Sequence, residues 1–242
     1  MRDTWLVFVR SMRPLLRNPA VIIFSLMTQP VLFLVLFGPL LGGAGSWQWF
    51  VPGLIVQMGL FGTAYAGFSL IPEIRSGALE RMRVTPVSRV SLLLGRVMRD
   101  VVVLLVQCVL LLALSTAFGF RATIPDVLLA LVYAVFLGVS IGSVSYTLAL
   151  KLKHEYAFAP VLSSTVMPLM LLSGVLLPMD QGPRWLYTIS RINPFSHIVD
   201  AVRAVIAGDL TSSSVLVGGI IAITLAALCL LWGTNTFRRT NA

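Results

Sequence analysis

Charged side chains are scarce in this chain and absent from several long stretches. Only 11% of the 242 residues are Asp, Glu, Lys or Arg, whereas soluble domains average about 25%. The 55 residues from Asn18 to Pro72 include none of the four. Further charge-free runs are Val101–Phe120, Val127–Leu150, Tyr156–Met179 and Leu210–Phe237. A membrane-spanning helix needs about 20 such residues, so the pattern excludes a water-soluble domain and predicts an all-α membrane protein that crosses the bilayer six times.

The chain is also poor in residues that catalysis, metal binding and disulfides require. Cys108 and Cys229 lie in separate apolar runs with no Cys or His at metal-ligand spacing, so neither a disulfide nor a metal site is expected. Lys151 and Lys153 are the only lysines, and no glycine-rich phosphate loop precedes them. The chain alone is therefore expected to hydrolyse no nucleotide, to contain no catalytic residue and to bind no cofactor.

The apolar runs predict one transmembrane domain that occupies residues 1–242. The expected spans are 21–41, 50–71, 101–119, 127–150, 156–177 and 215–232. No ionisable residue is expected inside them. Small residues at Gly62–Ala66 and Gly138–Gly142 are expected to pack helices together.

Two segments outside the spans are predicted to be short helices. Residues 1–18 place Arg10, Arg13 and Arg17 on one helical face and Trp5, Val9, Met12 and Leu16 on another, which predicts an amphipathic helix on the membrane surface. A merely basic flank is the alternative. Residues 182–208 contain two apolar stripes separated by Asn193-Pro194, each too short to cross a bilayer, with an ordinary surface loop as the alternative.

The cations indicate how the chain is oriented. With both termini in the cytoplasm, 14 of the 18 Lys and Arg residues lie on the inner side. The other four are Arg121, Arg184, Arg191 and Arg203. Because inner loops of membrane proteins carry an excess of Lys and Arg, this distribution predicts cytoplasmic termini in a plasma membrane. Cations at the ends of apolar runs indicate topology rather than binding to nucleic acid.

The most charged segment follows the second expected span, at residues 72–89. Its sequence begins PEIRSGALERMRVTP and mixes charges of both signs. A short charged helix that ends at Pro86 could dock a cytoplasmic partner, because mixed charge gives a contact specificity. A solvated loop of topogenic arginines is the alternative interpretation.

This segment resembles the cytoplasmic loop of ABC-2-type transporter permeases, R-x-x-G-T-L-E-x-x-x-x-T-P. Gly77, Leu79, Glu80, Thr85 and Pro86 match that pattern, and Ala78 replaces its usual Thr. The stretch NPFSHIVDAVR after the fifth expected span is similar to the family's segment before its last span. The resemblance, which extends to daunorubicin-resistance-type drug efflux permeases, covers nearly the whole chain.

The resemblance implies an N-terminal interfacial helix, a coupling helix and two outer re-entrant helices. It also implies a separate cytoplasmic ABC ATPase subunit, which binds ATP and Mg, and a second permease subunit, identical or related. The ATPase-coupling residues would be Glu73, Ile74, Arg75, Gly77, Leu79, Glu80, Arg81, Met82 and Pro86. An outer gate would contain Asn193, Pro194, His197, Asp200 and Arg203.

The family's substrate path lies along the second and fifth spans. On one face of each, this sequence has Gln57, Phe61, Tyr65 and Phe68, and Ser163, Met167 and Met170. Aromatic rings and flexible methionines suit a lipid-like or drug-like cargo, and plain helix packing is the alternative role. Export of a hydrophobic small molecule is the expected function. A polysaccharide or teichoic-acid cargo, a passive channel and a membrane scaffold protein are the alternatives.

Overall fold

The structure, a computed structural model, describes residues 2–17, 19–40, 44–77, 88–176, 179 and 182–239. Within these ranges the regular elements are all helical. They are α1 (Arg2–Arg17), α2 (Pro19–Leu40), α3 (Ala44–Ala64), the 3-10 helix η1 (Tyr65–Leu70), α4 (Ile71–Arg75), α6 (Arg89–Thr116), α7 (Ile124–Leu152), α8 (Glu155–Leu172), α9 (Arg184–Ile192), α10 (Pro194–Ile206) and α11 (Ser213–Arg239).

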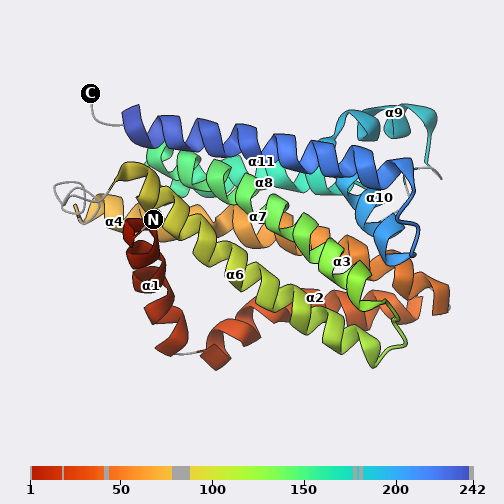
Figure 1. The fold of residues 1–242 in the computed structure, drawn as a ribbon. Coiled ribbons are helices and arrows are strands. Elements are labelled where there is room, and N and C mark those ends of the chain that lie inside the picture. The colour runs from red at the N-terminus through yellow and green to blue at the C-terminus, as the bar shows by residue number, and fades with distance from the viewer. Residues whose placement is uncertain are drawn as a thin grey trace.

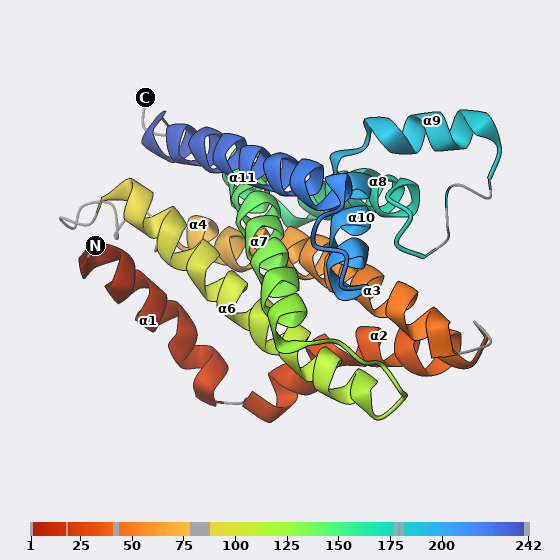
Figure 2. The ribbon, with the colours of Figure 1, turned by 45° about the vertical axis from the view of Figure 1, so that its right-hand side comes forward.

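The long helices run alongside one another, and the two ends of the bundle carry different short elements (Figure 1). The N-terminus, α4 and the C-terminal end of α11 lie at one end, where α1 crosses the bundle. Both α9 and α10 lie toward the other end, and the view turned by 45° preserves this separation (Figure 2). Helix α4, which includes the described start of the 72–89 segment, therefore lies at the same end as the start of α1 and the end of α11.

Five helical stretches are long and apolar enough to cross a membrane. They are Trp47–Arg75, Val90–Thr116, Ile124–Leu152, Glu155–Leu172 and Ser213–Arg239. They confirm the predicted all-helical, multi-pass membrane fold. The first expected span, 21–41, coincides with α2, whose described apolar part is Met27–Phe37, so its crossing of the membrane stays a prediction.

Helix α6 begins well before the expected span at 101–119. Ser88 caps its first turn, where the Ser88 Oγ accepts a hydrogen bond from the backbone N–H of Ser91 at 3.2 Å. The helix therefore includes Arg96, Arg99 and Asp100, all of which precede the expected span at 101–119, so the expectation of spans without ionisable residues stays a prediction. Side chains from neighbouring helices pair with these charges, which is how a membrane helix tolerates them.

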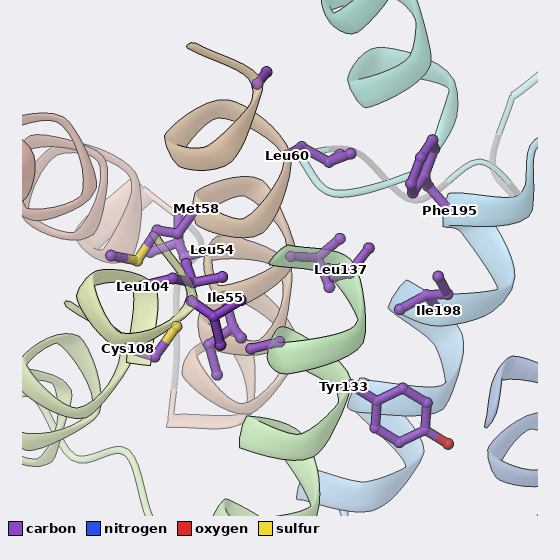
Figure 3. Close-up of a cluster of buried hydrophobic side chains, with 14 of the residues drawn as sticks. Leu54, Ile55, Met58, Leu60, Leu104, Cys108, Tyr133, Leu137, Phe195 and Ile198 are labelled. Atoms are coloured by element: carbon purple, nitrogen blue, oxygen red, sulfur yellow. The ribbon is translucent and has the colours of Figure 1, made fainter. Parts of the chain in front are cut away.

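The centre of the bundle is α7, which packs against α3, η1, α6, α10 and α11. Figure 3 shows the core that results, with side chains from four helices in contact range. The labelled residues are Leu54, Ile55, Met58 and Leu60 of α3, Leu104 and Cys108 of α6, Tyr133 and Leu137 of α7, and Phe195 and Ile198 of α10. Gly138 faces Val101 and Leu104 of α6, as expected for a helix-packing glycine.

The end of α9 and the start of α10 are fixed by Asn193 and Pro194. The Asn193 side chain caps α10 by accepting a hydrogen bond from the backbone N–H of Phe195 at 3.1 Å, and Pro194 occupies the first turn. Helix α10 then packs tightly on α11, because a Cβ on Gly218 would lie 2.6 Å from the His197 carbonyl oxygen. The two expected short helices are thus present, and their place outside the cytoplasm stays a prediction.

Helix α1 packs against α6, and Val7 contacts the hydrophobic core. Trp5 and Leu16 of the expected apolar stripe are 56% and 68% exposed. These two members of the stripe therefore do not pack within the described part of the chain. They are exposed apolar side chains on a helix that also carries arginines, which is the composition of a membrane-surface helix.

Candidate functional site

A cavity of about 230 Å³ lies between α2, α3 and α6. Three residues of the predicted substrate path, Gln57, Phe61 and Tyr65, line it. The other lining residues are Gln29, Pro30, Leu54, Met58, Gly62 and Gln107. Amide groups from three helices therefore meet two aromatic rings in a space whose described lining carries no charge.

Gln57 is the most unusual residue of this cavity. Its side chain is only 4% exposed, and its Oε1 is a buried atom without a hydrogen-bond partner in the structure. Leaving a buried acceptor unsatisfied costs about 1–3 kcal/mol. A polar atom kept in this condition beside a cavity is suited to accept a hydrogen bond from a molecule that enters it.

Aromatic side chains extend from the cavity along α3 and η1. The ring centroids of Phe61 and Tyr65 are 6.4 Å apart, and Tyr65 stacks on Phe68 at 5.9 Å with 11° between the ring planes. Phe68 meets Phe158 of α8 edge to face at 4.9 Å. Such pairs stabilise a helix interface beyond simple burial, so the row both joins α8 to η1 and lines one side of the predicted path.

Only part of the predicted path comes together. On α8, the Ser163 Oγ lies 3.4 Å from the Tyr65 hydroxyl, so this residue reaches the aromatic row. Met170 is buried in the core and Met167 is 55% exposed, and neither lines the cavity. The structure thus groups the α3 and η1 residues with Ser163 and separates them from the two methionines.

Three cavity residues were missed in the sequence as part of the substrate path. Gln29 and Gln107 lie in apolar runs, and an uncharged amide within a span is itself a signal of a polar site. Gly62 was expected to pack helices, and a Cβ there would have the Gln107 Oε1 as its nearest neighbour at 3.7 Å. Gly62 therefore lies against α6, as expected for a packing residue, and borders the cavity as well.

The helix that carries this site changes its winding at η1. Tyr65–Leu70 form a 3-10 helix between α3 and α4, and such a stretch inside a helix is often a hinge or a strained segment. Gly67 allows the close approach of α7, because a Cβ there would lie 2.6 Å from the Ser145 carbonyl oxygen. The Gly67 N–H donates to the Ser145 Oγ at 2.9 Å, and this hydroxyl donates to the Ala64 carbonyl, which ties η1 to α7.

Four of the predicted coupling residues follow η1 directly. Glu73, Ile74 and Arg75 lie in α4, and Gly77 ends the turn with φ +67°. The remaining predicted coupling residues, Leu79, Glu80, Arg81, Met82 and Pro86, lie outside the described residues. The described part already shows that one continuous stretch, Trp47–Arg75, carries both cavity and coupling residues.

Glu73 is held by a residue that the sequence did not indicate. Arg96 of α6 donates two hydrogen bonds to its carboxylate, from Nη2 to Oε2 at 2.5 Å and from Nη1 to Oε1 at 3.3 Å. Arg96 is 5% exposed and Glu73 37% exposed, so a nearly buried cation depends on a half-buried partner. Because Glu73 is more than a third exposed, solvent screening lowers the cost of losing this pair below that of a fully buried one. The two hydrogen bonds nevertheless join α4 to α6.

A second polar cluster lies one turn further along α6. The Arg99 Nη2 donates to the Asp100 Oδ1 at 2.6 Å and to the Tyr146 hydroxyl at 3.0 Å. That hydroxyl in turn donates to the Asp100 Oδ2 at 2.6 Å. This closed triangle joins α6 to the centre of α7 and explains how two ionised groups are accommodated in a span.

The predicted outer-gate residues occupy two environments. Asp200 pairs with Arg191 of α9 at 2.7 Å, and the His197 ring nitrogen lies 3.0 Å from the Arg191 carbonyl oxygen. Partial burial opposes the charge of Arg191, but its hydrogen bonds to Asp200 and Tyr187 outweigh this effect and raise its pKa. These residues link α9 to α10.

Arg203 turns inward instead of sharing a solvated face with Asp200. Its guanidinium donates to the carbonyl oxygens of Trp49 at 3.2 Å and Gly174 at 2.8 Å, and it lies 3.9 Å from the Trp49 ring centroid. The planar guanidinium suits this combination of hydrogen bonds and stacking. Arg203 therefore holds α3, α10 and the segment after α8 together, which is a positioning role.

A multi-pass helical bundle with a polar-and-aromatic cavity is an architecture expected of a membrane transport protein. The comparison with known proteins supports this class, because the ABC-2 type transporter family matches residues 2–207. The chain belongs to that family and is an ABC transporter permease, the membrane subunit rather than the ATPase.

The named relatives share about a quarter of their residues with this chain. The daunorubicin resistance ABC transporter permease protein DrrB1 of Streptomyces coeruleorubidus is 26% identical over 77% of this chain and 69% of its own length. The protein named transport permease ycf38 of Cyanophora paradoxa is 26% identical over 84% and 73%. The protein named doxorubicin resistance permease DrrC of Mycobacterium tuberculosis is 26% identical over 72% and 66%.

Proposed function

We propose that this permease exports a hydrophobic small molecule or lipid-like compound across a bacterial plasma membrane, with both termini in the cytoplasm. The observation that carries the proposal is the uncharged cavity at Gln57, Phe61 and Tyr65, with its buried and unpaired amide oxygen. Apolar walls with a few convergent polar groups are typical of small-molecule sites. The drug-resistance names of two relatives point in the same direction.

The chemistry of the lining supports a cargo with both polar and flat apolar parts. Three neutral amides can bind hydroxyl or N–H groups, and the rings of Phe61 and Tyr65 can contact a flat apolar surface. The cavity holds about 230 Å³, less than the roughly 300 Å³ at which drug-sized pockets begin. We infer that a second permease copy, identical or related, or a movement of the helices completes the site.

The energy would come from a separate ATPase subunit that binds ATP and Mg. Its contact would include the predicted coupling residues around Glu73 and Ile74 in α4. A push on α4 would reach the cavity through η1, because α4, η1 and α3 form one helical stretch. The Glu73–Arg96 pair would carry part of the same displacement to α6.

A glycan cargo is the second candidate. The stacked pair Tyr65–Phe68 and the three amides could also bind a sugar, because rings stack on its apolar face and amides bind its hydroxyls. The apolar side chains of Pro30, Leu54 and Met58 in the lining favour the small hydrophobic cargo.

The test is ATP-dependent uptake into inverted vesicles that contain this permease and the ATPase with which it co-purifies. The probe is daunorubicin, chosen from the name of a relative, and labelled short polysaccharide is the parallel probe. Saturable uptake of daunorubicin that Gln57→Leu weakens supports the proposal. Uptake of the polysaccharide alone would favour the glycan cargo, and failure of a folded permease to capture any ATPase would overturn the exporter assignment.

A further inference from the structure

A second, larger pocket opens where α7 and α11 end. It holds about 510 Å³ at the end of the bundle that also carries both termini. Its lining residues are Leu150, Lys151, Lys153, Trp232, Asn235, Thr236 and Arg239. None of the residues assigned above to cargo, coupling or gating takes part in it, so the pocket needs a separate explanation.

The chain builds this pocket by ending α7 in a left-handed turn. Lys153 has φ 58°, and its N–H donates to the Ala149 carbonyl oxygen at 3.0 Å, which closes the helix. Two of the chain's cations, Lys151 and Lys153, therefore lie at one helix end. The Lys151 Nζ lies 4.9 Å from the centroid of the Trp232 ring, so the two helices meet through a cation–π contact.

The charge of this pocket exceeds what its helix ends can balance. Lys151, Lys153 and Arg239 contribute three positive charges, and the described lining includes no carboxylate. The C-termini of α7 and α11 each supply the equivalent of about half a negative charge. A local excess of roughly two positive charges remains, and an anion is the natural counterpart.

The surroundings of the pocket are those of a membrane interface. Leu228 and Leu231, on the same helix as Trp232, are 60% and 63% exposed, and Trp232 itself is 40% exposed. Tryptophan is enriched at the level of lipid headgroups. An anion bound here could therefore continue into apolar chains that lie along the outer surface of α11.

We propose that this pocket binds the phosphate-bearing headgroup of an anionic phospholipid. Lys151, Lys153 and Arg239 bind the phosphate, Asn235 and Thr236 offer hydrogen bonds to the rest of the headgroup, and the acyl chains follow Leu228 and Leu231. The volume would hold roughly 17 water molecules at about 30 Å³ each, far more than a single phosphate ion requires. Basic pockets between membrane helices bind acidic headgroups in this way.

The test uses Trp232 as the reporter in the purified full chain. The protein is placed in lipid nanodiscs of zwitterionic phosphatidylcholine, and phosphatidylglycerol with brominated acyl chains is titrated in. Brominated phosphatidylcholine serves as the parallel titrant. The same titration is run on the Trp232→Phe variant, which keeps the other four tryptophans. The difference in quenching between the two proteins is the contribution of Trp232. We expect brominated phosphatidylglycerol to reach half-maximal quenching at a several-fold lower lipid fraction than brominated phosphatidylcholine does.

Variants then test the contribution of the cations. Each Lys or Arg near a lipid surface contributes about 1 kcal/mol, a factor of about five, so Lys151→Gln with Lys153→Gln should abolish the several-fold anionic preference. Arg121→Gln is the matched control, because Arg121 is exposed in the turn at the opposite end of α7. Arg239→Gln, at the end of α11, gives a single-site measurement if the double variant folds poorly.

Each outcome decides the proposal. Equal quenching by the two lipids, or an unchanged preference in both Lys151→Gln/Lys153→Gln and Arg239→Gln, would overturn it. Displacement of the anionic lipid by millimolar inorganic phosphate alone would show a free-phosphate site and would refute the lipid assignment. Because the readout needs neither ATP nor cargo, its result is independent of the exporter function.

Discussion

Replacing Gln57 by Leu should make the protein more stable and its cargo binding weaker. The two side chains are similar in size, but leucine has no polar atom to leave unsatisfied. Gln57 is almost fully buried at the cavity wall, and its Oε1 lacks a partner. If that oxygen is reserved for cargo, the empty protein carries a penalty that Gln57→Leu removes.

The gain in stability and the loss of cargo affinity can both be estimated from the Gln57 Oε1. An unsatisfied buried acceptor costs about 1–3 kcal/mol. In a chain of this length each kcal/mol moves the thermal midpoint by about 2–4 °C, so the midpoint should rise by about 2–12 °C. A lost hydrogen bond to cargo costs about 1 kcal/mol, which weakens binding about fivefold.

The assay pairs thermal unfolding in one detergent with equilibrium binding of daunorubicin to the same preparations. Gln48→Leu is the matched control, because Gln48 lies on the same helix and is exposed. That variant should change neither quantity appreciably.

Two results would refute the reasoning at different points. A lower thermal midpoint in Gln57→Leu would mean that the amide oxygen is hydrogen-bonded in the folded protein. A higher midpoint with unchanged binding would mean that the cavity is not where cargo binds.

Three further predictions concern the cavity and the two arginines that hold the helices. Gly62→Ala should leave transport nearly intact, since the nearest neighbour of the added Cβ lies 3.7 Å away. Gly62→Leu should fill the cavity and reduce uptake about tenfold or more. Equal uptake by both variants would exclude the cavity as the cargo site. Glu73→Gln should destabilise the protein by about 1 kcal/mol or more in chemical unfolding, because the nearly buried Arg96 loses its carboxylate partner. The added change Arg96→Met should restore most of this loss; no restoration would contradict the pairing. Arg203→Lys should lower the thermal midpoint by about 6 °C or more, because a lysine cannot span both carbonyls and the Trp49 ring; an unchanged midpoint would count against the positioning role.

The sequence predicted the helices well and their partners poorly. Runs without charge marked the spans because burial in lipid excludes unpaired ions. The same logic placed Arg96, Arg99 and Asp100 before the span, although they belong to the same helix, α6. Their partners, Glu73 and Tyr146, lie 23 and 46 residues away in the chain, and no local pattern reports a contact of that range.

The site shows the same division. Gln57, Phe61 and Tyr65 share a helical face, so spacing alone placed them together. Gln107 joins them only because α6 packs against α3. Arg203 was grouped with Asp200 as an outer-gate residue, but its long side chain reaches the carbonyl of a residue 154 positions away. Helical periodicity in the sequence predicts which residues share one face of a helix. The residues of other helices that contact this face depend on tertiary packing, which the sequence pattern does not report.

The 3-10 winding of η1 couples the length of the helical stretch Trp47–Arg75 to the rotation of one of its ends against the other. Six residues of 3-10 helix rise about 12 Å, whereas the same six rise about 9 Å in an α-helix. Rewinding Tyr65–Leu70 would therefore draw α4 toward α3 by about 3 Å and rotate one against the other by about 120°. A modest axial push at Glu73 would be converted into a turn of the face that carries Tyr65, with no need to tilt the whole bundle.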